Sequence, residues 1–206
     1  MDQDEEAQRA AELKASALHR LGWETGAGAT VWARSIQDEL VRHEKAREDH
    51  AANTADLQAW ERFHGSALLL VVAIDQVLAF ERRVRSLTGD AELAKARARF
   101  DAVGPDAEKL RDLVAHLDAY AVGQGRRQTG RAMPPLAEEH LETFLYWGNG
   151  GGTELRLGDK QVNLRAAANA AVDLAQVVER VRAKHLQITE QRANAAMRRR
   201  YGLPPE

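Results

Sequence analysis

The sequence predicts a mainly α fold, a helical bundle with a small β-hairpin inserted before the C-terminal helix. Apolar residues recur at helical spacing through most of the 206 residues, whereas strict alternation is confined to about residues 142–164. Proline, the strongest helix breaker, occurs only at positions 105, 134, 135, 204 and 205. A chain of this length is expected to form a single helical domain over residues 1–206.

The first half of the chain is helical by pattern. Three helices are predicted here, over residues 4–21, about 30–52 and about 54–88. The glycine-containing stretch 22–28 ends the first helix, and residues 1–60 form the N-terminal helices of the domain. The apolar run Ala67–Ile74 is hydrophobic on every side, which predicts the central helix of the bundle, and Gly65 is expected to interrupt that helix.

The second half contains the only strand signals. The elements expected after residue 90 are, in order, a short charged helix ending near Gly104, a helix beginning after Pro105, a polar and basic loop at 122–135, a turn of helix at 136–141, a hairpin within 142–164 and a last helix from 165 to about 200. Residues 154–157 and 161–164 alternate about Gly158-Asp159-Lys160, which predicts the hairpin, and the aromatic run 143–147 is expected to be extended.

Composition limits the classes of function. The formal net charge of −2 provides no global field for nucleic-acid binding, and the absence of cysteine excludes disulfides, cysteine zinc sites and thiol nucleophiles. The first 25 residues lack a signal-peptide pattern, and the longest apolar run is too short to span a bilayer. We therefore expect a cytoplasmic protein with no membrane partner. Abundant alanine, with arginine exceeding lysine, is typical of a GC-rich bacterial genome.

Chemistry is best argued for the predicted helix that contains Arg111. Asp112, His116 and Tyr120 follow one another at four-residue spacing, so they share a stripe beside the apolar face. A carboxylate can orient a neighbouring imidazole and move its pKa toward neutrality. Arg111 adds a planar cation suited to phosphate. This combination predicts binding and cleavage of a phosphodiester.

The segment Leu110-Arg111-Asp112-Leu113-Val114-Ala115-His116 resembles the Arg-polar-three-His signature of the HEPN superfamily. The resemblance covers roughly residues 66–190. It implies a helical bundle that forms a homodimer, brings two motifs to one cleft and cleaves RNA without a metal or other cofactor. His116 would handle protons on the 2′-hydroxyl or the leaving oxygen, Arg111 would stabilise charge on the phosphate, and Asp112 would position one or both.

The resemblance also implies a biological setting. Such proteins act as toxins, in phage defence or in stress responses, with RNA as substrate and a protein partner or antitoxin. Arg111 and His116 lie about 140° apart around a helix, so two facing chains are expected to complete one site. Arg126 and Arg127, in the basic loop, are candidates to hold an RNA backbone, and a solvated loop is the equal alternative.

The bare spacing is not specific, because Arg180 and His185 repeat it in the last helix. That copy lacks the polar residue after arginine, and His185 falls on an apolar stripe, where a satisfied core or interface histidine is expected. The alternative for the first copy is an exposed Asp112–His116 pair that only decorates a helix. The chain would then be a non-catalytic helical dimerisation or protein-interaction module.

The remaining histidines are expected on polar faces or loops; they are His19, His43, His50, His64 and His140. A metal site at His43 and His50, with Glu44 and Glu48 nearby, is the alternative to a solvated helix face. We favour the solvated face and predict no metal ligands. The glycine-rich run 148–152 lacks the lysine and flanking elements of a phosphate-binding loop, so a hairpin connection is expected there.

Overall fold

The computed structural model describes residues 3–23, 28–115, 145–147, 153–157 and 160–200. The mainly α fold, with a small antiparallel β element before the C-terminal helix, is confirmed. The described elements are α1 (Gln3–Trp23), α2 (Ala29–Ala52), α3 (Leu57–Thr88), α4 (Ala91–Val103), α5 (Ala107–Ala115), β1 (Leu145–Trp147), β2 (Thr153–Leu157), β3 (Lys160–Asn163) and α9 (Leu164–Arg200).

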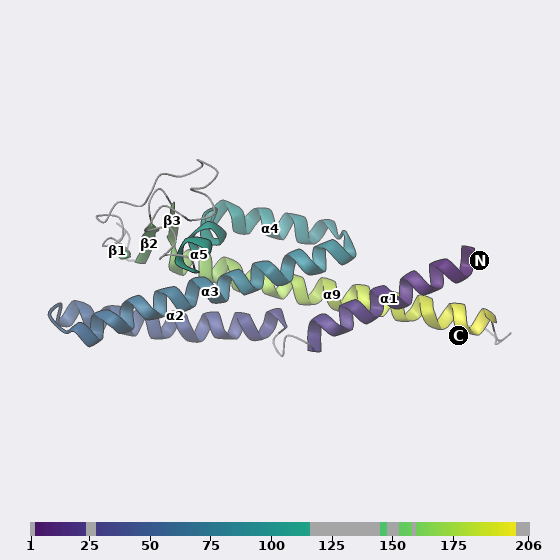
Figure 1. Cartoon of the computed structure of the whole chain (residues 1–206), viewed down its shortest axis with the longest axis horizontal. Coiled ribbons are helices and arrows are strands. Elements are labelled where there is room, and N and C mark those ends of the chain that lie inside the picture. The colour runs from purple at the N-terminus through teal and green to yellow at the C-terminus, as the bar shows by residue number, and fades with distance from the viewer. Residues whose placement is uncertain (1–2, 24–27, 116–144, 148–152, 158–159, 201–206) are drawn as a thin grey trace.

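The long helices lie lengthwise and give the molecule an elongated shape (Figure 1). α2 and α3 form an antiparallel pair, and α9 packs along both of them. α1 packs mainly against the C-terminal half of α9, so both chain ends lie at the same end of the molecule. α4 and α5 lie on the other side of α3 from α2, and the small sheet packs against α5 and the start of α9 (Figure 1).

Helix α3 is the central helix, as its apolar sequence predicts. Leu70, Ile74 and Leu78 of α3 are buried, together with Phe100 of α4 and Leu174 of α9. α3 is also the one described helix that is long and apolar enough to cross a membrane, but 61% of its apolar window is buried inside the bundle. That burial is consistent with the core helix of a soluble protein.

Capping residues set the boundaries of α3 and α4. The Asp56 side chain accepts hydrogen bonds from the backbone N–H groups of Gln58 and Ala59, so α3 begins at Leu57. Gly89 adopts the left-handed conformation, with φ of 62°, and ends α3. Asp90 then caps α4 through the N–H of Glu92. The cap that ends α3 is thus followed directly by the cap that begins α4, and the chain turns sharply between the two helices.

The sheet adds a third strand to the predicted hairpin. β2 pairs with β3 on one side and with β1 on the other, both antiparallel, and Leu155 is opposite Val162 and Leu145. Leu155 and Val162 are buried in the core. The interruption expected at Gly65 is wrong, because α3 continues through it. The basic loop predicted at 122–135 and the helical turn predicted at 136–141 lie outside the described residues.

Candidate functional site

Arg111, the cation of the predicted motif, lies on α5 and faces α3. Its Nε donates a hydrogen bond to Oδ2 of Asp75 over 2.8 Å. The Asp75 side chain is buried, whereas the Arg111 side chain keeps 37% of its surface exposed. Arg111 therefore extends from the core to the surface, and its charge is balanced by a carboxylate of the central helix.

Asp75 accounts for the orientation of Arg111. It follows directly on the apolar run Ala67–Ile74 in α3. A carboxylate in such surroundings is costly unless it is paired and hydrogen-bonded. Arg111 supplies this pairing through Nε, and no other described residue accepts a hydrogen bond from its two Nη atoms. A pair of guanidinium donors of this kind is what bidentate phosphate recognition requires.

A second set of ion pairs fixes α5 against α3 and α4. Arg82 of α3 pairs with Glu108 of α5, and Arg97 of α4 contacts the same carboxylate over 3.0 Å. Arg97 also lies 3.5 Å from the fully buried Glu81, which Arg85 contacts over 2.7 Å. Three helices are tied together by these charges. α5 is consequently held in place at both Glu108 and Arg111.

The rest of the predicted site is only partly described. Asp112 follows Arg111 on α5 and is half-buried. His116, Arg126 and Arg127 lie outside the described residues, so their assigned roles stay predictions. The structure thus places the arginine of the motif and adds Asp75 as its partner.

The second Arg–His spacing has a structural role. Nε2 of His185 lies 3.0 Å from Oδ2 of Asp90, the residue that caps α4, and Arg180, which precedes His185 on α9, pairs with Glu92. The N–H of Glu92 and the His185 ring together lower the pKa of Asp90 to about 2. His185 is therefore a satisfied histidine that holds α9 to the start of α4, as its place on the apolar stripe predicts.

His43 corrects the expectation that the remaining histidines occupy polar faces. It is only 2% exposed and its ring stacks on Phe63, with centroids 5.0 Å apart. Its Nδ1 lies 3.0 Å from Oγ of Ser66. Burial lowers the pKa of His43 to about 4. The sequence around His43 looks polar because its neighbours on the chain face solvent, while His43 itself points at α3.

The alternative metal site at His43 and His50 receives no support from the geometry. Both rings pack against Phe63, and His64 meets the same ring edge-on. Among the described residues, no three potential ligands gather closely enough to hold a metal ion. The histidines of α2 and α3 form an aromatic cluster instead.

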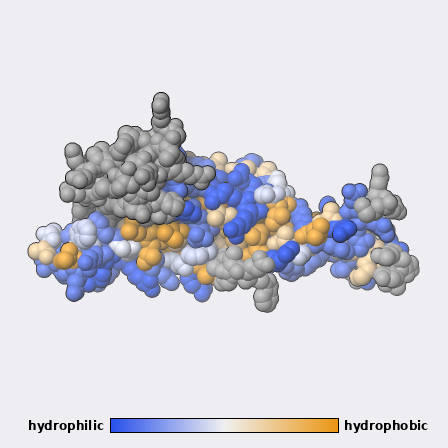
Figure 2. All heavy atoms as spheres, in the orientation of Figure 1, coloured by the Kyte–Doolittle hydropathy of each residue, from blue (hydrophilic) through white to orange (hydrophobic). Residues whose placement is uncertain are grey.

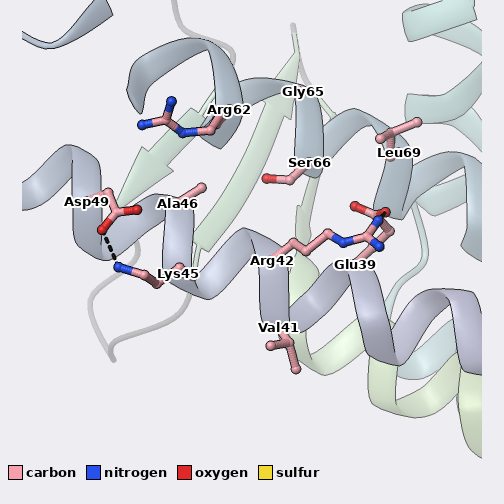
Figure 3. A pocket seen from close by; sticks show the side chains of 10 residues that line it. All are labelled: Glu39, Val41, Arg42, Lys45, Ala46, Asp49, Arg62, Gly65, Ser66 and Leu69. Carbon is pink, nitrogen blue, oxygen red and sulfur yellow. Dashed lines mark hydrogen bonds and ion pairs between the residues drawn. The ribbon is translucent and has the colours of Figure 1, made fainter. Parts of the chain in front are cut away.

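A hollow of about 570 Å³ lies between α2 and α3, and sequence reasoning did not foresee it. Arg42 and Lys45 line it from α2, and Arg62, Ser66 and Leu69 line it from α3 (Figure 3). Gly65 leaves room in its wall because no side chain fills the surface there. The only advance signal was the apolar run Ala67–Ile74 of α3, which is more apolar than one buried face requires.

Comparisons of the chain with known protein families, curated proteins and solved structures found no match.

Proposed function

We propose that this chain is a cytoplasmic, HEPN-like RNA-binding protein that cleaves RNA without a metal, in a bacterial toxin, phage-defence or stress system. The observation that carries the proposal is the arrangement of Arg111. Its guanidinium is anchored through Nε by the buried Asp75, while the side chain reaches the surface. An arginine fixed in this way has a preset orientation, which reduces the entropic cost of binding a phosphate.

The mechanism assigns one task to each residue. Arg111 holds the scissile phosphate and stabilises the negative charge that develops on it. His116 takes the proton of the 2′-hydroxyl or delivers one to the leaving oxygen, and Asp112 positions these groups. Attack by the 2′-hydroxyl restricts the substrate to RNA. Arg126 and Arg127 hold the RNA backbone, and no cofactor takes part.

A second candidate function is a non-catalytic module that binds another protein, such as an antitoxin. One observation favours it: α3 presents apolar side chains at the surface, among them Leu69 with 56% of its surface exposed. Exposed apolar surface of this kind marks protein interaction sites. Binding of RNA separates the two candidates, since only the first requires it.

Binding of a fluorescent single-stranded RNA tests the proposal directly. Wild-type protein is expected to bind with an affinity that falls as salt rises, because phosphate contacts release counterions. Arg111→Lys keeps the charge but loses the planar fork, so it should bind more weakly than wild type and more tightly than Arg111→Ala. Arg180→Ala is the matched control, because Arg180 has the same spacing to a histidine but pairs with Glu92. Equal affinity of wild type and Arg111→Ala would contradict the assignment.

A further inference from the structure

The outer face of α3 carries an ordered stripe, of which the functions above use only the exposed Leu69. Its positions are three or four residues apart, so they lie on one side of the helix. They are Glu61, Gly65, Leu69, Val72, Gln76, Ala79 and Arg83, and none of them is buried. The stripe spans about 33 Å at the helical rise per residue.

The middle of this stripe is uncharged and apolar where it meets solvent. Between Arg62 and Arg82, the only exposed residues of α3 are Leu69 and Val72, at 56% and 39% of their surface. Figure 2 shows hydrophobic atoms at the surface over this part of the molecule. A surface helix ordinarily turns polar side chains outward at these positions. No helix of the described part of the chain covers this face.

The order of residues along the stripe is nearly the same from both ends. Leu69 and the central Val72 are large and apolar, and Gln76 follows Val72 on the other side. The small residues Gly65 and Ala79 lie seven residues to either side of Val72, and charges of opposite sign close the two ends. This order is self-complementary for two antiparallel copies. We propose that a second copy of this chain covers the stripe, with α3 packed antiparallel on the partner's α3 about a two-fold axis at Val72.

This axis fixes the contacts by counting residues from Val72. Val72 meets the partner's Val72, Gly65 meets the partner's Ala79, and Glu61 meets the partner's Arg83. Gly65 and Ala79 have small side chains, so the two helix axes can approach closely where these residues meet. Glu61 and Arg83 are exposed, and neither forms an ion pair with another residue in the described part of the chain, so both are available to pair across the interface. An isologous interface must be complementary to itself in this way.

The size of the interface follows from the same geometry. A strip about 33 Å long and about 10 Å wide has a footprint of about 330 Å², less than half of the roughly 800 Å² per partner of a standard interface. An interface of standard size would need further contacts, and side chains of α2 that border the hollow beside the stripe, such as Val41 and Arg42, would supply them. The dimer is accordingly expected to exchange with monomer at micromolar concentration.

The arrangement bears on the proposed RNA site. Asp75 precedes Gln76 of the stripe and lies three residues from the axis, so the two copies of Asp75 are about 9 Å apart along the helices. Each Asp75 anchors an Arg111, and the two-fold axis places both arginines on the same face of the dimer. What that shared face does rests on the proposed function; the contact between the α3 helices does not.

Sedimentation velocity of the full chain from about 1 to 100 μM tests the inference. Wild type is expected to shift from monomer to dimer over this range, and Val72→Glu to remain monomeric. The control is Val103→Glu, because Val103 of α4 is similarly exposed, at 44%, but lies off the stripe. Circular dichroism of each variant confirms that it is folded. A monomeric wild type, or a dimer that tolerates Val72→Glu, overturns the inference.

Charge reversal tests the register. Glu61→Arg and Arg83→Glu are each expected to weaken the dimer by about tenfold, since two exposed pairs worth up to about fivefold each become like-charge contacts. The double variant Glu61→Arg/Arg83→Glu restores the pairs and should return to the wild-type constant. Failure of the double variant to recover overturns the antiparallel contact. A dimer that behaves as described but leaves RNA intact supports the contact and overturns the RNA cleavage.

Discussion

Acid should destabilise this protein through one buried imidazole, that of His43. The hydroxyl of Ser66 donates its hydrogen to the carbonyl oxygen of Phe63, so Oγ accepts a hydrogen bond from Nδ1–H of His43. The neutral ring therefore carries its proton on Nδ1. Nε2 is buried and meets no hydrogen-bonding group among the described residues. A second proton on Nε2 would put a charge in apolar surroundings, which is why burial lowers the pKa of His43 to about 4.

The sign and size of the effect follow from linkage. Between pH 6.5 and about 4, the unfolded chain binds a proton at His43 that the folded protein does not bind. Stability therefore rises with pH through this window and is lost as pH falls. At about 1.36 kcal/mol per unit of pKa, the loss reaches about 3 kcal/mol. Burial and the charge of His50 also lower the pKa of His64, which adds a loss of the same sign.

Urea unfolding between pH 8 and pH 4.5 measures this loss. His43→Leu removes the titrating group at similar volume, so its free energy of unfolding should fall less than that of wild type over the same range. His19→Leu is the control, because His19 is half-exposed and pairs with Glu190 at the surface. Carboxylates titrate in all three proteins, and the differences between the curves isolate His43. Parallel curves for wild type and His43→Leu would refute the reasoning.

Three further predictions concern stability. Arg111→Ala leaves Asp75 buried without its partner and should lower the free energy of unfolding in urea by about 1 to 2 kcal/mol. This loss is smaller than for a fully buried pair because Arg111 is partly exposed. Arg180→Ala, at a surface pair, should lower it by less than about 0.5 kcal/mol. Gly89→Ala places a Cβ at positive φ and should cost about 1 kcal/mol in thermal unfolding. Phe100→Ala removes a fully buried ring and should lower the free energy of unfolding by about 3 to 5 kcal/mol. Wild-type stability of Arg111→Ala, Gly89→Ala or Phe100→Ala would contradict the structural role given to the residue that is replaced.

Local pattern was enough to predict most of the fold. Helical periodicity located the six described helices, and alternation about Gly158 located the β2–β3 hairpin. The predicted start of α3 was three residues early, because the cap at Asp56 is a side-chain hydrogen bond that periodicity does not detect. Gly65 did not break α3, since packing against α2 outweighs the low helix propensity of a single glycine.

Contacts between distant helices explain what sequence reasoning missed. Asp75 was visible only as the end of an apolar run, and its pairing with Arg111 depends on how α5 docks on α3. His43 has charged neighbours on α2, so only the position of Phe63 on α3 reveals its burial. The uncovered stripe of α3 is likewise defined by where α2 and α9 pack. A single sequence states which residues share a helix face, but not which face another helix covers.

Cleavage of RNA in the presence of EDTA tests the central claim most directly. Wild-type protein should cut a mixed RNA pool and leave 2′,3′-cyclic phosphate ends, because the 2′-hydroxyl is the nucleophile. His116→Ala and Arg111→Ala should each lose about a hundredfold or more of the rate, while His185→Ala should keep most of it, since His185 binds Asp90 at the start of α4. Equal inactivity of wild type and His116→Ala would contradict the account, and so would full activity of both histidine variants.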